Sequence, residues 1–183
     1  MVSNCRLVSS GRMTYAKELA KHISVDIFGA CGTKSCKKSE SKKCFEMIKQ
    51  EYKFYLVFEN SKCMSYTTEK FSQNALSNNA IPIVLGVSRA EMRETAPPGS
   101  YIHVEDFENP RKLAEYLHKI DKDDNLFNEF FRWRRYGEMI NTKTWCRFCS
   151  MLHETTIPTV TQKNIDEWWR GSGTCIGANN WRY

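Results

Sequence analysis

The 183-residue sequence lacks long apolar runs, internal repeats and glycine-rich phosphate-binding patterns. No apolar stretch approaches the roughly 20 residues of a membrane-spanning helix, so no span is predicted within it. G-x-G-x-x-G and G-x-x-x-x-G-K-[ST] are both missing, which argues against the common dinucleotide-binding and P-loop classes. Nine glycines and five prolines, spread without a repeat, exclude fibrous and low-complexity chains.

The composition predicts a globular chain with a real core. Apolar residues make up 41% and aromatic residues 13% of the sequence, which excludes intrinsic disorder. The length is that of one domain by the usual prior of roughly 100–200 residues.

The net charge of +6 is concentrated in residues 1–53, which hold eleven basic and five acidic side chains. Such an excess marks either a face for an anionic ligand such as a phosphate or an ordinary solvated surface. Nucleic-acid binding is not expected, because no aromatic residue is interleaved with the basic run from Lys37 to Lys43.

Eight cysteines are many for a chain of this size. An even count favours disulfides and an oxidising compartment. The alternative is a zinc site, with one ligand pair from the Cys146-x-x-Cys149 motif and a second pair from Cys31 and Cys36.

Short apolar runs alternate with amphipathic segments along most of the chain. This order predicts an α/β fold with a doubly wound parallel sheet. A short strand is expected to end within residues 2–4, and the tail from 155 to 183 reads as irregular. The other expected strands are 25–29, 54–58, 81–86 and 101–104. The expected helices are 12–22, 44–51, 66–79, 110–120 and 125–139.

The most informative segment follows the strand at 54–58. In open α/β sheets, ligands bind beyond the carboxyl ends of the strands. There the chain offers acidic, amide and hydroxyl groups, then the start of a helix bearing Glu69 and Lys70. Helix N-termini and lysines hold anions, and a neighbouring carboxylate suits sugar hydroxyls. The spacing fits a sugar nucleotide, although a capped surface helix would also produce it.

The same segment resembles the donor-binding signature of the α1,3-fucosyltransferases, commonly F-x-L-x-F-E-N-S-x-C-x-D-Y-[IV]-T-E-K. Residues 54–70 read FYLVFENSKCMSYTTEK. Matching blocks flank it on both sides, and the similarity is closest to animal members. These blocks are VSNC at 2–5, GR at 11–12, VDIFGACG at 25–32, PPGSYI at 97–102, VEDF at 104–107, FRW at 131–133 and WCRFC at 145–149.

The resemblance implies the C-terminal half of a two-domain GT-B glycosyltransferase. Residues 1–153 would form a Rossmann-like domain that binds GDP-fucose, and residues 154–183 an irregular tail. The implied reaction transfers fucose with inversion to N-acetylglucosamine of glycoprotein or glycolipid glycans, in the Golgi lumen. A membrane anchor is expected only in the full-length protein.

The family's binding roles carry over to five positions of this sequence. Arg12 and Lys70 would contact the pyrophosphate, and Asn60, Tyr66 and Glu69 would hold the fucose and nucleoside portions. The catalytic base is expected in the N-terminal domain, so we expect this chain alone to bind donor and to transfer nothing. No cofactor or catalytic metal is implied.

The signature also shows departures from the family. Ser65 stands where Asp is usual, Thr67 replaces Ile or Val, and Arg93-Glu94 replaces Tyr-Glu. Since Ser65 removes a charge beside the site, the alternative function is a diverged, non-catalytic nucleotide-sugar-binding or interaction module.

The resemblance also bears on the cysteines. It implies that Cys146 and Cys149 pair with cysteines of the N-terminal domain and are unpaired here. At least one local disulfide is expected among four other cysteines, although the sequence does not show which of them pair. These are Cys31, Cys36, Cys44 and Cys63.

Three further groups have ordinary structural interpretations. The D-x-D sequence at 121–123 lies between two helices and is interpreted as a helix cap. His103 and His153 have no partners at metal or triad spacing and are assigned to packing or surface. Four aromatic residues at near-helical spacing are predicted to be core: Phe127, Phe130, Phe131 and Trp133.

Overall fold

The computed structural model describes residues 11–140, 142–156, 158, 161, 164–171 and 173–176. The strand expected within residues 2–4 lies outside them. The strands are β1 (Phe54–Phe58), β2 (Lys62–Cys63), β3 (Ile81–Leu85), β4 (Ile102–His103) and β5 (Cys175–Ile176). The α-helices are α1 (Arg12–Leu19), α2 (Ser41–Glu51), α3 (Arg89–Thr95), α4 (Pro110–Asp121), α5 (Asp124–Glu129), α6 (Thr144–Leu152) and α7 (Ile165–Arg170).

Five shorter helical turns complete the fold, and one of them is π-helical. The π-helical turn is η2 (Lys70–Ala75). The 3₁₀ turns are η1 (Lys38–Glu40), η3 (Leu76–Asn78), η4 (Val104–Asp106) and η5 (Arg132–Arg135).

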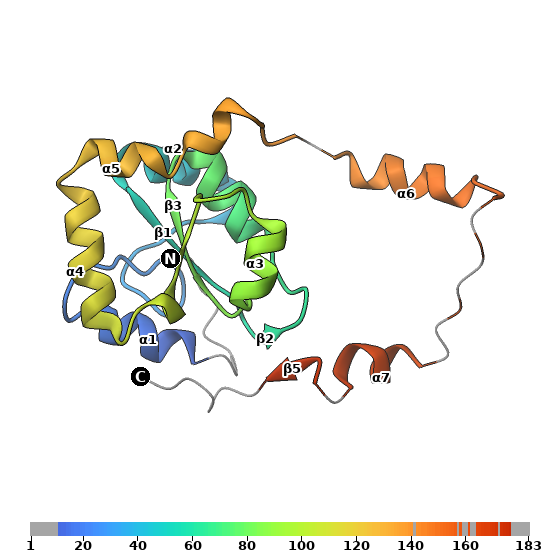
Figure 1. The fold of residues 1–183 in the computed structure, drawn as a ribbon, viewed down its shortest axis with the longest axis horizontal. Coiled ribbons are helices and arrows are strands. Elements are labelled where there is room, and N and C mark those ends of the chain that lie inside the picture. Colours follow the sequence, from blue (N-terminus) through green and yellow to red (C-terminus); the bar gives the residue numbers. More distant parts are fainter. Residues whose placement is uncertain are drawn as a thin grey trace.

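Three parallel strands form the central sheet in the order β1-β3-β4 (Figure 1). Leu56 pairs with Ile83, and Ile83 with Ile102. The runs that form β1 and β3 are nearly all apolar, as strands covered on both faces must be. The α/β class with a parallel sheet is confirmed.

One expected strand is not found. Within the described residues, the only ladder contact of segment 25–29 is an isolated bridge from Phe28 to Lys34. Gly29, at φ 94°, turns the chain back, and its N–H donates to the Lys34 carbonyl at 2.9 Å. The segment therefore folds onto its own continuation.

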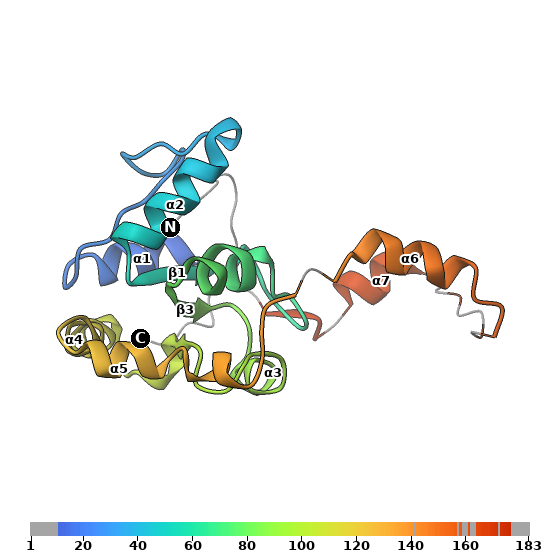
Figure 2. The same cartoon turned by 90° about the horizontal axis from the view of Figure 1, so that it is seen from above.

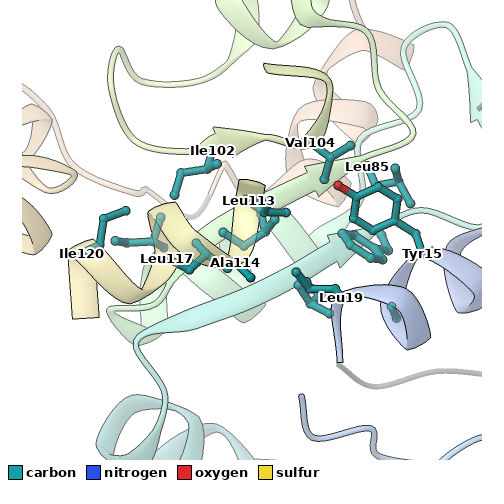
Figure 3. Packing of buried hydrophobic residues seen from close by; sticks show 14 of the residues in the cluster. Tyr15, Leu19, Leu85, Ile102, Val104, Leu113, Ala114, Leu117 and Ile120 are labelled. Atoms are coloured by element: carbon teal, nitrogen blue, oxygen red, sulfur yellow. The ribbon is translucent and has the colours of Figure 1, made fainter. Parts of the chain in front are cut away.

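Helices α1 and α4 cover one face of the sheet. The apolar i, i+3, i+4, i+7 positions of α4 place Leu113, Leu117 and Ile120 at 2% exposure or less (Figure 3). From α1, Tyr15 packs edge-on against Phe58 of β1, with ring centroids 5.7 Å apart. Burying each such side chain contributes about 1.5–3 kcal/mol.

A second buried cluster covers the other face of the sheet. It joins Val57 and Val84 of the strands to Ile48 of α2, Met92 of α3 and Trp133 of η5. Helices thus cover both faces of the sheet in the described part of the chain.

The helix expected at 125–139 ends at Glu129 and is followed by η5. Phe130 packs in the cluster with α4, whereas Trp133 packs in the cluster on the opposite face. One straight helix could not direct both side chains to opposite faces of the sheet. The prediction that these aromatics form core is confirmed, with Phe127 and Phe131 partly buried.

Among its described residues, the segment from 155 onward contains two regular elements, so it is not irregular throughout as expected. Helix α7 begins after Asn164, whose side chain accepts from the Glu167 N–H, and β5 pairs antiparallel with β2. Both views place α6 and α7 apart from the central sheet (Figures 1 and 2). The division of the chain at residue 153 stays a prediction.

Side-chain caps fix several helix starts. Asn109 caps α4 through the Lys112 N–H, and Asp123 caps α5 through the Asn125 and Leu126 N–H groups. The interpretation of the D-x-D sequence as a helix cap is confirmed for Asp123.

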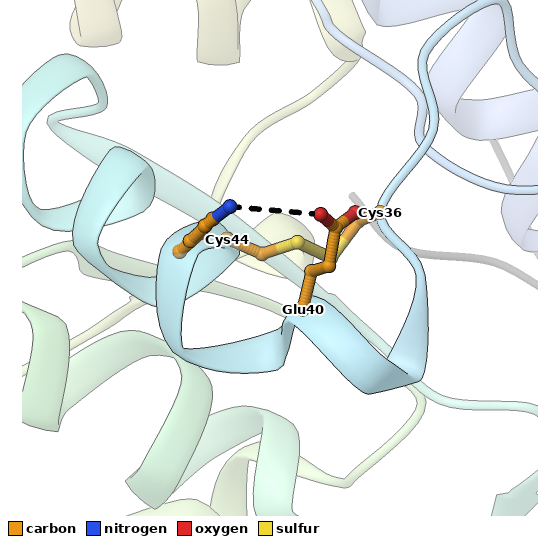
Figure 4. Close-up of a disulfide and its surroundings, with 4 residues drawn as sticks. Cys36, Glu40 and Cys44 are labelled. Carbon is orange, nitrogen blue, oxygen red and sulfur yellow. Dashed lines mark ion pairs between the residues drawn. A yellow bond between two sulfur atoms is a disulfide. The ribbon is translucent and has the colours of Figure 1, made fainter.

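The cysteines between the end of α1 and the first turn of α2 form disulfides in the structure. Cys36 and Cys44 form a disulfide beside the Glu40–Lys43 ion pair (Figure 4). Cys31 is also disulfide-bonded. Neither Cys31 nor Cys36 is therefore a free thiol, and the zinc alternative loses two of its four ligands. Cys146 and Cys149 are free and exposed on α6.

Candidate functional site

Polar groups gather where β1 and β3 end. Glu59 follows β1, and Gly86, at φ +119°, follows β3. A Cβ at Gly86 would lie 3.0 Å from the Cβ of Glu59 and 3.3 Å from the Ser61 carbonyl oxygen. Only glycine permits both this backbone conformation and this approach.

Glu59 is the centre of the site. Its carboxylate is fully buried and accepts three hydrogen bonds. The donors are the Thr68 N–H at 3.1 Å, the Thr68 hydroxyl at 2.7 Å and the Lys70 ammonium at 2.8 Å. These contacts close residues 59–68 into a loop, called here the site loop.

Arg12 reaches the same place from the start of α1. Gly11 at φ 64° precedes the helix, and the Arg12 side chain is buried. Its Nη1 donates to the Phe58 carbonyl at 3.1 Å. Burial lowers the pKa of Arg12, while the charge of Glu59 and the phenol of Tyr66 oppose that shift. The structure thus places Lys70 on Glu59 and Arg12 on the neighbouring Phe58 carbonyl, where the charge of Glu59 and the phenol of Tyr66 both act on Arg12.

The site is less positive than its two cations suggest. Glu59 neutralises one of them, so Arg12, Lys70 and Glu59 together carry a single net positive charge. Lys70 has 15% of its side chain exposed and also donates to the Thr68 hydroxyl at 2.8 Å. An ammonium has three donors, and Glu59 and Thr68 take two of them. The third makes no hydrogen bond within the described residues, and the Glu69 carboxylate lies 3.9 Å from the ammonium.

The helix expected to start near Tyr66 begins only at Lys70, as the π-helical turn η2. The reason is local, because the Thr68 N–H and hydroxyl are both engaged by Glu59. Residues 66–68 are thereby held in the site loop instead of a helix. Single π-helical turns of this kind are frequent at functional sites.

The remaining predicted site residues flank this cluster. Asn60 is exposed and directly follows Glu59. Glu69 is half exposed, with a carboxylate oxygen 3.9 Å from the Lys70 ammonium. Their proposed contacts with a ligand stay predictions.

Two acidic residues with structural roles here were not identified from the sequence. Glu59 lies within the signature segment, and its position directly after a buried strand is the signal that points to it. Glu91 accepts from the Ser65 N–H and forms a capping box with Ser88 at the start of α3. Burial would raise the pKa of Glu91, but hydrogen bonds from Ser65 and Ser88 outweigh it and lower that pKa.

A row of ion pairs borders the carboxyl end of β4. Lys62 of the site loop lies 2.8 Å from Glu105, and Arg89 lies 3.2 Å from Asp106. Beneath them His103 is 1% exposed, with Nε2 2.8 Å from the Val87 carbonyl oxygen. Burial lowers the pKa of His103, so it is neutral near pH 7. The packing interpretation is confirmed for His103, and His153 is on the surface.

Within the part of the chain that the structure describes, no three His, Cys, Asp or Glu side chains are grouped so that they could hold a metal ion. No helix among these residues has the length and apolar character needed to cross a bilayer.

Comparisons with known proteins agree with one another. A family model described as Glycosyltransferase family 10 (fucosyltransferase) C-term matches residues 1–168. Glycoprotein 3-alpha-L-fucosyltransferase A of Drosophila melanogaster is 48% identical in an alignment of 183 positions that covers 99% of this chain and 36% of that protein. Alpha-(1,3)-fucosyltransferase C of the same fly is 36% identical over 173 residues, 93% of this chain and 40% of that protein.

One solved structure shares the fold. A crystal structure of an alpha1,3-fucosyltransferase superposes with a TM-score of 0.59 at 22% identity, covering 87% of this chain and 49% of that one. This chain therefore spans less than half the length of these relatives.

Proposed function

The chain belongs to glycosyltransferase family 10, and from that premise we propose that it is the donor-binding part of an α1,3-fucosyltransferase. The proposed donor is GDP-fucose. The proposed acceptor is N-acetylglucosamine on glycoprotein or glycolipid glycans, met in the Golgi lumen. The observation that supports this best is the placement of two cations at the carboxyl ends of the strands, with Lys70 on the buried Glu59 and Arg12 on the Phe58 carbonyl beside it.

In the proposed complex the two cations hold the diphosphate. The Arg12 guanidinium has the planar geometry to bind two phosphate oxygens at once. The free Lys70 N–H supplies a point charge, which Glu59 keeps in place. Asn60, Tyr66 and Glu69 would meet the fucose and nucleoside.

These residues would act on the departing GDP. As the bond to fucose C1 breaks with inversion, negative charge develops on the leaving diphosphate. Positive charge fixed beside that oxygen stabilises the transition state more than the ground state. Because Arg12 and Lys70 are already held by the Phe58 carbonyl and Glu59, little reorganisation is needed during the reaction.

A calorimetric titration tests the proposal. We expect the chain to bind GDP more tightly than UDP, and Arg12→Met and Lys70→Met each to weaken GDP binding by about tenfold or more, the loss of a charged contact. Lys17→Met is the matched control, since Lys17 is exposed on the same helix as Arg12. Circular dichroism checks that each variant is folded.

Two results would contradict the proposed function. One is the absence of any heat from GDP with the folded wild-type chain. The other is GDP binding that survives both charge removals unchanged.

The non-catalytic alternative rests on Ser65, which lacks the carboxylate usual at this position. The backbone there, at φ 55°, tolerates Asp. If the Ser65→Asp variant binds GDP clearly more tightly than the wild-type chain, the result would support the alternative, a non-catalytic module whose affinity for the donor has fallen. An unchanged affinity would favour the enzyme.

A further inference from the structure

The site loop is attached to the far end of the chain. Strand β2 lies within the loop and pairs with β5, matching Lys62 to Ile176 and Cys63 to Cys175. The Met64 N–H donates to the Thr174 carbonyl at 2.8 Å. A disulfide joins Cys63 to Cys175 across 112 residues of sequence.

This bridge lies three residues before Tyr66, at the tip of the site loop. The base of the loop is closed by the contacts of Glu59 with Thr68. On its other sides the tip is held by the Ser65 N–H bond to Glu91 and by the ion pair of Lys62 with Glu105. These two contacts are noncovalent and at least partly exposed, whereas the bridge from Cys63 to Cys175 is covalent.

Two-residue strands have little stability by themselves. The pairing of β2 with β5 therefore depends on the covalent bond between Cys63 and Cys175. Without that bond, Thr174 and Ile176 would have no fixed place beside the loop. The Met64 amide would then turn to water, and the backbone next to Tyr66 would lose one of its supports.

We propose that the Cys63–Cys175 disulfide is a positioning element for donor binding. It holds the tip of the site loop, and with it Tyr66, in the arrangement that receives the nucleotide sugar. This inference rests on the proposed function. It adds that a segment from the opposite end of the sequence sets donor affinity.

The energetic argument concerns the ordering of the loop. A loop that is ordered before binding does not lose conformational entropy when the ligand arrives, whereas a loosened one does. Ordering a few residues on binding weakens affinity by about tenfold, which corresponds to about 1.4 kcal/mol. We therefore expect removal of the bridge to weaken GDP binding without abolishing it.

The chain offers a matched control. The Cys36–Cys44 disulfide bridges the start of α2 and takes no part in the site loop. The two variants to compare are Cys63→Ser/Cys175→Ser and Cys36→Ser/Cys44→Ser. Both are made in a Cys146→Ser/Cys149→Ser background, because exposed thiols exchange with disulfides.

Calorimetry with GDP, thermal unfolding and hydrogen exchange of residues 62–68 are measured for both. We expect the Cys63/Cys175 variant to bind GDP about tenfold more weakly and to exchange faster in the loop. The Cys36/Cys44 variant should keep the GDP affinity of its background even if its Tm falls. Reduction and reoxidation of the background protein should lower and then restore affinity.

Tyr66→Phe separates positioning from general stability. In the background protein this change should weaken GDP binding, because the hydroxyl is held beside the nucleotide. In the Cys63/Cys175 variant the same change should cost less, since Tyr66 is no longer held. Equal losses in both would mean that the bridge does not position Tyr66.

The remaining outcomes are also decisive. A folded Cys63/Cys175 variant with unchanged GDP affinity overturns the inference and leaves the proposed function standing. A variant without native circular dichroism shows that the bridge supports the fold as a whole, which also overturns the inference. If the wild-type chain itself does not bind GDP, the proposed function fails and the inference fails with it.

Discussion

The two ends of the parallel strands use the same ion-pair chemistry in different surroundings. At the carboxyl ends, Lys70 meets Glu59 with side chains 15% and 0% exposed. At the amino ends, Lys34 meets Asp26 with side chains 47% and 31% exposed. The Tyr52 hydroxyl donates to the same Asp26 oxygen at 2.6 Å. Both carboxylates thus have a lysine and a hydroxyl as partners.

The difference is burial, and it changes what each pair can do. The amino-end pair lines an open cavity of about 780 Å³, where water screens its charges. The carboxyl-end pair is shielded, so its charges act strongly on whatever enters beside them. A lysine–carboxylate pair by itself therefore does not identify a binding site, whereas a buried pair at the carboxyl ends of parallel strands is a strong candidate.

The largest loss of stability is expected when the buried carboxylate of Glu59 is removed. Glu59→Ala leaves the Lys70 ammonium and the Thr68 donors without their acceptor. We expect a loss of about 3–5 kcal/mol in the free energy of unfolding, as for other broken buried pairs. Urea denaturation measures it, and Glu59→Gln, which keeps an acceptor, should lose less. A loss below about 1 kcal/mol for Glu59→Ala would mean that the pair is effectively solvated.

The histidines at the two ends extend the comparison to pH. His103 is buried at the carboxyl end and has a lowered pKa, so the unfolded chain takes up a proton before the folded one does. Stability should therefore fall as the pH drops below about 6.5, the ordinary value. We expect this to lower the Tm by roughly 2–4 °C between pH 7.5 and pH 5.

Substituting His103→Gln should flatten that dependence of Tm on pH. The control is His118→Gln. His118 is exposed near the amino ends of the strands, and its Nε2 is hydrogen-bonded to the His22 carbonyl. An equal flattening by both variants would show that burial of His103 is not the cause.

Two residues with positive φ provide a finer contrast. Ser65 at the carboxyl end has φ 55°, and Asn79 at the amino end has φ 58°. Asn tolerates this conformation better than Ser because its side chain bonds the local backbone. We expect Ser65→Asn to stabilise the chain and Asn79→Ser to destabilise it, each by up to about 1 kcal/mol in urea denaturation. Shifts of the same sign would contradict this account.

The smallest loss of stability is expected when the exposed carboxylate of Asp26 is replaced. The hydrogen bond from Lys34 lowers the pKa of Asp26, as does the bond from Tyr52. Because solvent screens this pair, Asp26→Asn should cost less than about 1 kcal/mol of unfolding free energy at pH 7. The small loss should vanish in acid, as the pH falls through the lowered pKa and the wild-type carboxylate is protonated. A loss as large as that of Glu59→Ala would remove the contrast between the two ends.

The sequence was most informative where one local rule decides the structure. The apolar runs predicted β1, β3 and β4, and Asn109 followed by Pro110 predicted the start of α4. The rule that ligands bind beyond the carboxyl ends of strands also directs attention to the residues after β1, and there Lys70 contacts Glu59.

Prediction failed where distant residues compete for the same group. Periodicity alone could not show that the Thr68 N–H and hydroxyl both donate to Glu59, which holds residues 66–68 in the site loop and delays η2 to Lys70. The break after Glu129 depends on which cluster receives Phe130 and which Trp133. The pairing of Cys63 with Cys175 depends on a register set 112 residues later, which no spacing encodes.

That long separation also sets an order of events during synthesis. Cys63 leaves the ribosome well before its partner, so its thiol stays available to other oxidants and to Cys36 or Cys44 while β3, α3 and α4 are still being made. The carboxyl end of the sheet therefore becomes covalently complete only after Cys175 has emerged. Any early, incorrect disulfide of Cys63 would have to be reshuffled before the chain matures, which is a slow step unless an isomerase accelerates it.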